Sequence, residues 1–335
     1  MVRKRYVVFG IGFAFARVCF GDSISNNQAI HSGFESPYAE LALVLRSNTQ
    51  AIDSMVAQHA IQVRNTFLEQ SKFPLNLCGN INYTHENGKR YHSNDAIAWV
   101  GLDFSYNNFI LKRICTAGVF GGVSKDYMRY RCDELSKGNM RTGFGGYYGN
   151  FTILGLDIST LSLLGSGKSN TNCPTFSFSE TNFSHFTHSH RIIHSKIDVG
   201  HTWELGNLDF TPTIGLCADQ LKQNGATEWQ QNSLRLKVID GIGGVRIGRD
   251  YEKFCTNLFL GAEHNLHKRW SGGEIKVNDV SENFTLTAFD KTKFLVSMGL
   301  CYDCIELWDL DLSFSGRYGS RHRNSTFGLT LSKNF

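Results

Sequence analysis

The final stretch of the chain, from residue 294 to residue 335, alternates between apolar and polar positions. Apolar side chains occupy every second position in three successive runs: Phe294, Val296, Met298, Leu300 and Tyr302; Trp308, Leu310, Leu312 and Phe314; Phe327, Leu329 and Leu331. Except for Leu295, the positions between them hold small or charged residues, among them Asp309 and Asp311. A period of two places these two sets on opposite faces of a strand. Charge on one face, followed by a C-terminal aromatic residue, Phe335, is typical of a transmembrane β-barrel with an apolar outside and a polar lumen.

The same period extends back to Pro74 and predicts twelve strands. We expect them near residues 75–84, 94–106, 109–123, 138–149, 151–164, 190–203, 207–219, 233–248, 254–266, 285–302, 305–318 and 323–335. Short connections alternate with long ones, which lie at 85–93, 124–137, 165–189, 220–232 and 267–284. Bacterial barrels have short periplasmic turns and long external loops, so both ends of the barrel should face the periplasm. The predicted fold is all-β, a 12-stranded antiparallel transmembrane β-barrel over residues 73–335 that contacts outer-membrane lipid.

The alternation also predicts which charged side chains face the lumen. In the strand near 207–219, Asp209 alternates with the apolar residues. In the strand near 233–248, leucine and valine alternate with Arg235 and Lys237, and glycines at 241, 243 and 244 then suggest a bulge. We therefore expect these residues to line the lumen: Asp209, Arg235, Lys237, Asp309, Asp311 and Arg317.

A different period precedes the strands and predicts a helix over residues 36–72. Ser36 offers an N-cap and Pro37 the favoured first helical position. Apolar residues recur at steps of mostly three and four: Leu41, Leu45, Ile52, Met55, Val56, Ala60, Val63 and Phe67. At ~1.5 Å per residue this helix would be longer than a bilayer is thick. A coiled coil or a surface helix is the alternative interpretation.

The N-terminus has the features of a secretory signal peptide over residues 1–21. Arg3, Lys4 and Arg5 precede an uncharged run from Tyr6 to Ala16, which indicates export through the Sec translocon. Residues 22–35 form a short polar segment. Removing residues 1–21 takes away four basic and no acidic side chains, which leaves 30 of each. The neutral mature chain offers no compositional support for nucleic-acid binding.

Eight cysteines lie beyond the predicted signal: Cys78, Cys115, Cys132, Cys173, Cys217, Cys255, Cys301 and Cys304. An even number in an exported chain allows disulfides, although their pairing cannot be read from sequence. They either reinforce the envelope, within the chain or to other envelope proteins, or several are inert strand residues. Cys301 and Cys304 form a CxxC pair without a second pair at zinc spacing, so a tight turn explains them better than a metal or redox site.

Two motifs in the longest predicted loop are weaker signs of a site. Gly165-Ser-Gly-Lys-Ser169 resembles half of a phosphate-binding loop, but Ser162 stands where the full pattern has glycine, and we expect a flexible linker. His185, His188 and His190 could capture a metal, but a solvated polar loop is the favoured interpretation.

Enzymatic activity is not expected. His194 and Ser195 are adjacent and point to opposite faces of a strand, so they cannot pair as in an outer-membrane phospholipase. No paired acids and no His-Asp pair stand out at a loop rim. We predict no catalytic residue, no cofactor and no metal site.

Four stretches, taken in order, resemble a known family in detail. They are Leu208-Asp-Phe-Thr-Pro-Thr-Ile-Gly-Leu, Asn232-Ser-Leu-Arg-Leu-Lys-Val, Gly316-Arg-Tyr-Gly-Ser-Arg, and Phe327-Gly-Leu-Thr-Leu with the terminal Phe335. Together with the helix and twelve strands, they resemble the C-terminal translocator domain of type V secretion autotransporters. The resemblance covers about residues 30–335.

The resemblance implies that the helix threads the lumen of the barrel. It also implies that the β-barrel assembly machinery binds the last strand through an insertion signal, namely Phe327, Leu329, Leu331 and Phe335. Two features depart from the family: only residues 22–35 stand where a passenger would be, and Lys333 replaces an apolar residue. Asn26-Asn27 precedes the helix, so a cleavage between asparagines, which some members perform, would release only a stub.

Our main hypothesis is an autotransporter-like outer-membrane β-barrel of a Gram-negative bacterium, a translocator whose helix fills its lumen. The second is a general porin or channel whose helix sits outside the pore. The third is a surface adhesin whose external loops bind, with the barrel as a scaffold. Conductance measured with and without the helix distinguishes the plugged translocator from the porin. Deletion of the loop at 165–189 tests the adhesin, because binding should disappear while conductance survives.

Overall fold

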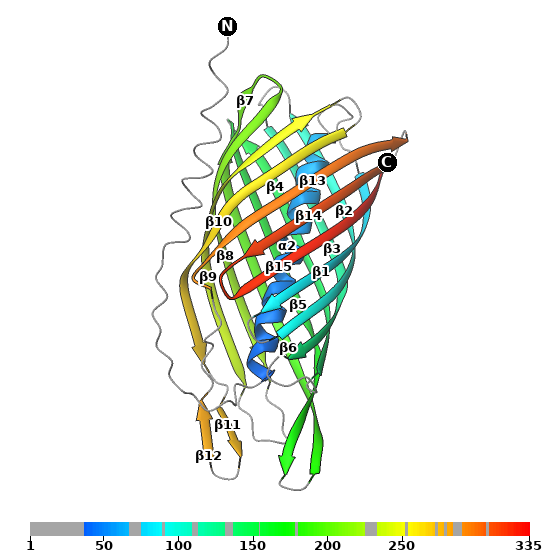
Figure 1. Cartoon of the computed structure of the whole chain (residues 1–335). Coiled ribbons are helices and arrows are strands. Elements are labelled where there is room, and N and C mark those ends of the chain that lie inside the picture. Colours follow the sequence, from blue (N-terminus) through cyan, green and yellow to red (C-terminus); the bar gives the residue numbers. More distant parts are fainter. Residues whose placement is uncertain are drawn as a thin grey trace, which may run out of the picture. The chain divides into compact units, whose positions relative to one another are not determined.

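The alternating segments form a closed antiparallel β-barrel in the computed structural model, with a helix inside it (Figure 1). The structure describes residues 37–66, 75–88, 91–108, 113–130, 137–153, 155–177, 180–224, 233–251, 254–271, 274–277, 280–283, 290–305 and 308–335. The predicted signal peptide and the polar segment at 22–35 lie outside these residues. No helix among the described residues is long and apolar enough to cross a membrane.

Twelve strands make up the wall of the barrel. They are β1 (Leu75–Gly88), β2 (Tyr91–Asn108), β3 (Arg113–Tyr130), β4 (Lys137–Ile153), β5 (Leu156–Ser177), β6 (Glu180–His201), β8 (Leu208–Gln223), β9 (Leu234–Asp250), β10 (Phe254–Ser271), β13 (Thr292–Ile305), β14 (Trp308–Tyr318) and β15 (His322–Asn334). Each pairs with the next, β15 pairs with β1, and the pairing of β6 with β8 completes the circle. The predicted 12-stranded antiparallel barrel is therefore confirmed.

Three short strands lie outside this ring. Strand β7 (Trp203–Leu205) pairs with the start of β8, and β11 (Glu274–Val277) pairs with β12 (Val280–Asn283) as a separate hairpin. We call the end of the barrel that holds Leu75 and Phe335 the terminal end, and the opposite end, where β5 and β6 meet, the hairpin end (Figure 1). The backbone amide of Phe335 donates to the carbonyl of Leu75 at 2.9 Å, which joins the two ends of the barrel sequence.

Helix α2 (Pro37–Thr66) runs through the barrel, with its first residues toward the hairpin end (Figure 1). Its early residue Asn48 donates to Asp126 of β3, near the hairpin end, and its late residue His59 contacts Asp103 of β2, near the terminal end. The predicted lumen-threading helix is confirmed. Its last predicted residues, 67–72, lie outside the described part of the chain.

The strands reach further toward the hairpin end than the sequence suggested. Most of the loop expected at 165–189 is the paired hairpin of β5 and β6, so the predicted flexible linker at Gly165–Ser169 is wrong. The expected strand start at 285 is also too early, because β13 begins at Thr292. The bulge lies between Asn265 and His267 of β10, whereas the glycines of β9 stay in register. The polar stretch expected as a loop continues the strands, because β5 and β6 are already paired with each other and regular cross-strand hydrogen bonding can extend along both.

The histidines of this hairpin are part of the barrel wall rather than of a solvated loop. His188, His190 and His194 are buried, whereas His185 is exposed. His190 Nε2 lies 2.9 Å from Thr142 Oγ1, and His194 Nδ1 lies 2.7 Å from Asp219 Oδ1. The expectation of a solvated loop is therefore wrong for His188 and His190, because the strands carry them into the lumen.

Candidate functional site: the plugged lumen

Helix α2 is buried on every side inside the barrel. Its apolar residues, such as Leu41 and Val56, are buried, and so are the polar residues Arg46, Gln50 and Asp53, each at most 3% exposed. It contacts strands all around the ring, namely β1 to β6, β8 and β13 to β15. An amphipathic helix that is buried on both faces needs a lumen with an apolar side and a polar side.

The apolar side of the lumen lies against the apolar residues of α2. One buried cluster unites Leu45, Ile52 and Val56 of the helix with inward residues of the barrel wall. The wall residues include Tyr91, Met128, Met140, Leu163, Ile192, Leu221 and Leu236. This part of the lumen therefore resembles the core of a globular domain more than a water-filled pore.

The polar side is built around Arg46 of the helix. Its Nε donates to Asp219 Oδ2 at 2.7 Å, and its Nη2 contacts the carboxylates of Asp240 and, at 3.4 Å, Glu263. The three acids stand on the neighbouring strands β8, β9 and β10. All four side chains are buried. A buried cation requires such partners, because desolvation of an isolated charge costs several kcal/mol.

Asp53, two helical turns further on, has partners of the opposite charge. Lys196 Nζ and Arg317 Nη2 each lie 3.4 Å from Asp53 Oδ2. Arg317 also contacts Glu263 and donates to the backbone carbonyl of Gln50 at 3.2 Å. Lys196 in turn lies 3.1 Å from Asp198. The barrel thus offers acids to the cation of the helix and bases to its anion, which sets the rotation and the depth of the helix in the lumen.

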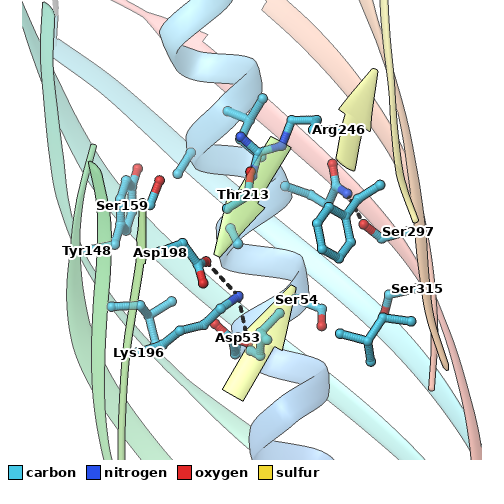
Figure 2. A pocket seen from close by; sticks show the side chains of 18 of the residues that line it. Asp53, Ser54, Tyr148, Ser159, Lys196, Asp198, Thr213, Arg246, Ser297 and Ser315 are labelled. Carbon is cyan, nitrogen blue, oxygen red and sulfur yellow. Dashed lines mark hydrogen bonds and ion pairs between the residues drawn. The ribbon is translucent and has the colours of Figure 1, made fainter. Parts of the chain in front are cut away.

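A small cavity lies beside the helix. Figure 2 shows it next to Asp53 and Lys196, with Tyr148, Arg246 and Ser315 also on its wall. Its volume is about 80 Å³. A water molecule needs ~10–15 Å³ by this measure, so the cavity holds a few waters but no peptide chain. With α2 in place, this cavity has no room for a transported segment.

The structure places the predicted lumen-lining residues in two groups. Asp309, Asp311 and Arg317 are buried, and Asp209 is half-buried at the terminal end. Four of the predicted residues thus lie on the lumen side.

The other two predicted lumen residues face outward. Arg235 and Lys237 are exposed, while Leu234 and Leu236, which alternate with them, are fully buried. The prediction for these two residues is wrong, because β9 extends toward the hairpin end, where the lumen holds the apolar face of α2. Leu234 packs there with Ala42 of the helix.

This inverted phase also hid an acid that contacts the helix. Asp240 has the same parity as Leu234 and is buried, yet the assumption that leucine faces lipid assigned it to the outside. Glu263 of β10 was missed as well, although it contacts both Arg46 and Arg317. The available signal was Arg46 itself, since a mid-helix arginine that enters a barrel must meet acids on the wall.

The residues predicted as the insertion signal form an outward stripe on β15. Phe327, Leu329, Leu331 and Phe335 are all exposed, between 46% and 65%. Lys333 stands beside them, with its Nζ 5.4 Å from the ring centroid of Trp308 and 5.1 Å from that of Phe335. The lysine therefore covers the aromatic rings of the rim and leaves the stripe continuous.

Five of the eight cysteines are free thiols in the structure. These are Cys78, Cys115, Cys217, Cys255 and Cys301, so the disulfides considered for them within the chain are absent. The expectation assumed that export favours pairing, whereas these thiols lie within the hydrogen-bonded wall of the barrel. Cys132 and the side chains of Cys173 and Cys304 lie outside the described part of the chain.

Comparisons with known proteins agree with this geometry. A model of the autotransporter beta-domain family matches residues 45–315. No curated protein sequence matches the chain significantly. Among solved structures, the translocator domain of the autotransporter NalP from Neisseria meningitidis is similar, with a TM-score of 0.62 and 14% identity, over 86% of this chain and 98% of that one.

Two further structures have the same fold. The beta domain of the Bordetella autotransporter BrkA has a TM-score of 0.55 at 13% identity, over 77% of this chain and 98% of that one. The transport unit of AIDA-I from Escherichia coli has a TM-score of 0.50 at 12% identity, over 86% and 98%. On the family match and the helix-filled twelve-stranded barrel, this chain belongs to the autotransporter beta-domain family and is an outer-membrane translocator barrel.

Proposed function

We propose that the chain rests in the outer membrane as a closed translocator and delivers the segment before α2 to the cell surface. The observation that carries the proposal is the direction of α2, which enters at the hairpin end and leaves toward the terminal end (Figure 1). Short turns and chain ends face the periplasm in bacterial barrels, so the hairpin end faces outward. The first turn of α2 is then on the outer side.

We propose the following route to this state. Residues 1–21 direct export through the Sec translocon, and the β-barrel assembly machinery binds the outward stripe of β15. The charged side chains of the barrel wall that pair with Arg46 and Asp53 then hold α2 in the lumen after delivery and keep the pore closed. Disulfide links to other envelope proteins remain a prediction for Cys132, Cys173 and Cys304 alone.

Planar-bilayer conductance of the refolded barrel tests this function. The chain from residue 22 onward should be closed, and the same chain without residues 22–72 should conduct, because its lumen loses α2. A matched control that lacks only residues 22–35 keeps the helix and should stay closed. Equal conductance with and without the helix would contradict the closed translocator and favour a porin.

A further inference from the structure

A second polar cluster, separate from the Arg46 and Asp53 contacts, surrounds His59 near the terminal end of the helix. The side chain of His59 is fully buried. Its Nε2 lies 2.7 Å from Asp103 Oδ2, and its Nδ1 lies 3.6 Å from Asp311 Oδ2 without making a hydrogen bond. The ring stands edge-on to Trp99 and Tyr148, with centroids 5.6 and 6.4 Å apart. The imidazole is thus held between two carboxylates in a fixed orientation.

A thiol completes this cluster. Cys78 of β1 stands opposite Gly101, and Asp103 of β2 stands opposite Asn76, so the thiol and the carboxylate occupy adjacent inward positions. One donor atom each from His59, Cys78 and Asp103 lies within 4.8 Å of the others. Gly101 leaves the space that the thiol uses, because a Cβ there would lie 2.8 Å from Cys78 Sγ.

The charge of the cluster is unbalanced. Asp103 and Asp311 are both buried, and within the described residues neither forms an ion pair with a lysine or an arginine. Asp103 accepts hydrogen bonds from Tyr148 and, at 3.1 Å, from Asn76 Nδ2, which are neutral donors. Two carboxylates away from water favour a compensating positive charge.

We propose that His59, Cys78 and Asp103 bind a zinc ion that fastens the plug helix to the barrel wall. Zinc prefers thiolate, imidazole and carboxylate ligands, with ligand bonds of ~2.0–2.3 Å, so a set of donor atoms within 4.8 Å of one another can close around it. Cys78 gives up its proton to solvent on binding, since only the thiolate is a ligand. Asp311 then accepts a hydrogen bond from the second nitrogen of His59, as partners of zinc-bound histidines commonly do.

A similar trio elsewhere in the lumen serves as an internal comparison. His194, Cys217 and Asp219 also approach one another, with Cys217 Sγ 3.8 Å from His194 Nδ1. There, however, Asp219 already accepts from Arg46 at 2.7 Å, and Lys196 lies close by on the strand of His194. These cations repel a metal ion, so we place the zinc site at His59 alone.

This site goes beyond the transport function and does not depend on it. His59 belongs to α2, whereas Cys78 and Asp103 belong to the first two strands, so the metal links the terminal end of the helix to the wall. The salt bridges of Arg46 and Asp53 hold the helix nearer its middle. The pore can therefore be closed without metal, and a failed zinc test leaves the conductance test unaffected.

Cobalt(II) is the probe for this site, because a cobalt–thiolate bond gives a charge-transfer absorption that oxygen and nitrogen ligands lack. The refolded barrel with its helix should develop this band with one equivalent of cobalt and lose it when zinc is added. Cys78→Ser and His59→Gln should abolish the band, and the matched control Cys217→Ser should keep it. Asp311→Asn should weaken binding ~10–100-fold, the usual effect of losing a partner of a zinc-bound histidine.

Two results would overturn the proposal: a folded barrel that shows no band, and a band that survives Cys78→Ser. Folding of each variant is checked by the gel shift of the unheated barrel. If Cys78→Ser does not fold, His59→Gln decides alone, since it changes only the helix. Zinc should then raise the unfolding temperature of the parent barrel and leave that of His59→Gln unchanged; an equal rise in both would also overturn the site.

Discussion

At the scale of single residues, the buried charged side chains of the lumen lie beside side chains of opposite charge. Arg46 meets acids from three strands, whereas Arg235, on the outer face of β9, is exposed. A buried ion pair contributes little net stability relative to apolar packing, but removing a cation that several buried acids share leaves them with too few partners. The role of Arg46 is therefore to fix one position of the helix in the lumen, and this role can be tested by removing its side chain.

Arg46→Ala should destabilise the refolded barrel with its helix by about 3–5 kcal/mol, because Asp219, Asp240 and Glu263 are left buried beside one another. Urea unfolding in detergent measures the change. The control Arg235→Ala removes the same side chain from the outer face and should stay within about 0.5 kcal/mol. Equal losses in both variants would contradict a charge-held plug.

At the scale of elements, the helix fits the barrel because some inward positions carry no side chain. A Cβ at Gly328 of β15 would lie 2.8 Å from Met55 Sδ of α2, and it would also lie 2.2 Å from Asn82 Oδ1 of β1 and 2.6 Å from Ser313 Oγ of β14. The glycine thus lets helix and wall approach at this point. Gly79 of β1, by contrast, has no atom within 4 Å of where its Cβ would be.

Gly328→Val should push Met55 away from the wall and cost about 1–3 kcal/mol, the usual range for overpacking of a tight core. The matched control Gly79→Val adds the same atoms where space is open and should be nearly neutral. In the chain without residues 22–72 the cost of Gly328→Val should fall but not vanish, because Met55 is gone whereas Asn82 and Ser313 of the wall remain. An undiminished effect of Gly328→Val in that shortened chain would place the strain within the wall alone.

At the scale of the whole barrel, the outer surface has an apolar band with aromatic side chains near the terminal end. Exposed aromatic residues there are Phe104, Phe151, Trp203, Tyr251, Phe254, Tyr302, Trp308 and Phe335. Transmembrane barrels carry such girdles on both sides of an apolar band ~25 Å tall. Leu329, six residues from Phe335 on a strand tilted by ~40°, lies roughly 15 Å from this rim and hence near the middle of the band.

Leu329→Arg should therefore cost about 2–4 kcal/mol and lower the amount of assembled barrel in the outer membrane. The control Leu77→Arg places the same charge at the rim, where Leu77 pairs with Lys333, and should cost about 0–1 kcal/mol. The fraction of heat-modifiable protein in membranes reports assembly, and normal amounts of Leu329→Arg would contradict the position of the band.

Much of this architecture could be predicted from local pattern. The outward stripe of β15 and the inward Asp309 and Asp311 follow from a period of two, and α2 follows from its 3.6 period and the proline at its start. The inversion in β9 could not be predicted this way. Alternation alone does not say whether Leu236 or Lys237 faces inward there, because the lumen is apolar where α2 turns its apolar face to the wall. In addition, outward side chains near the hairpin end do not have to contact lipid.

The sequence by itself determined the strands, the helix and the family of this protein, because alternation and amphipathicity are local and each strand must separate lipid from lumen. Only the tertiary structure decided which residues meet in the lumen. Arg46 is far along the chain from its acids, and His59 from Asp103 and Asp311. Such pairs depend on the register of every strand and on the rotation of α2, and these are fixed together when the barrel closes around its helix.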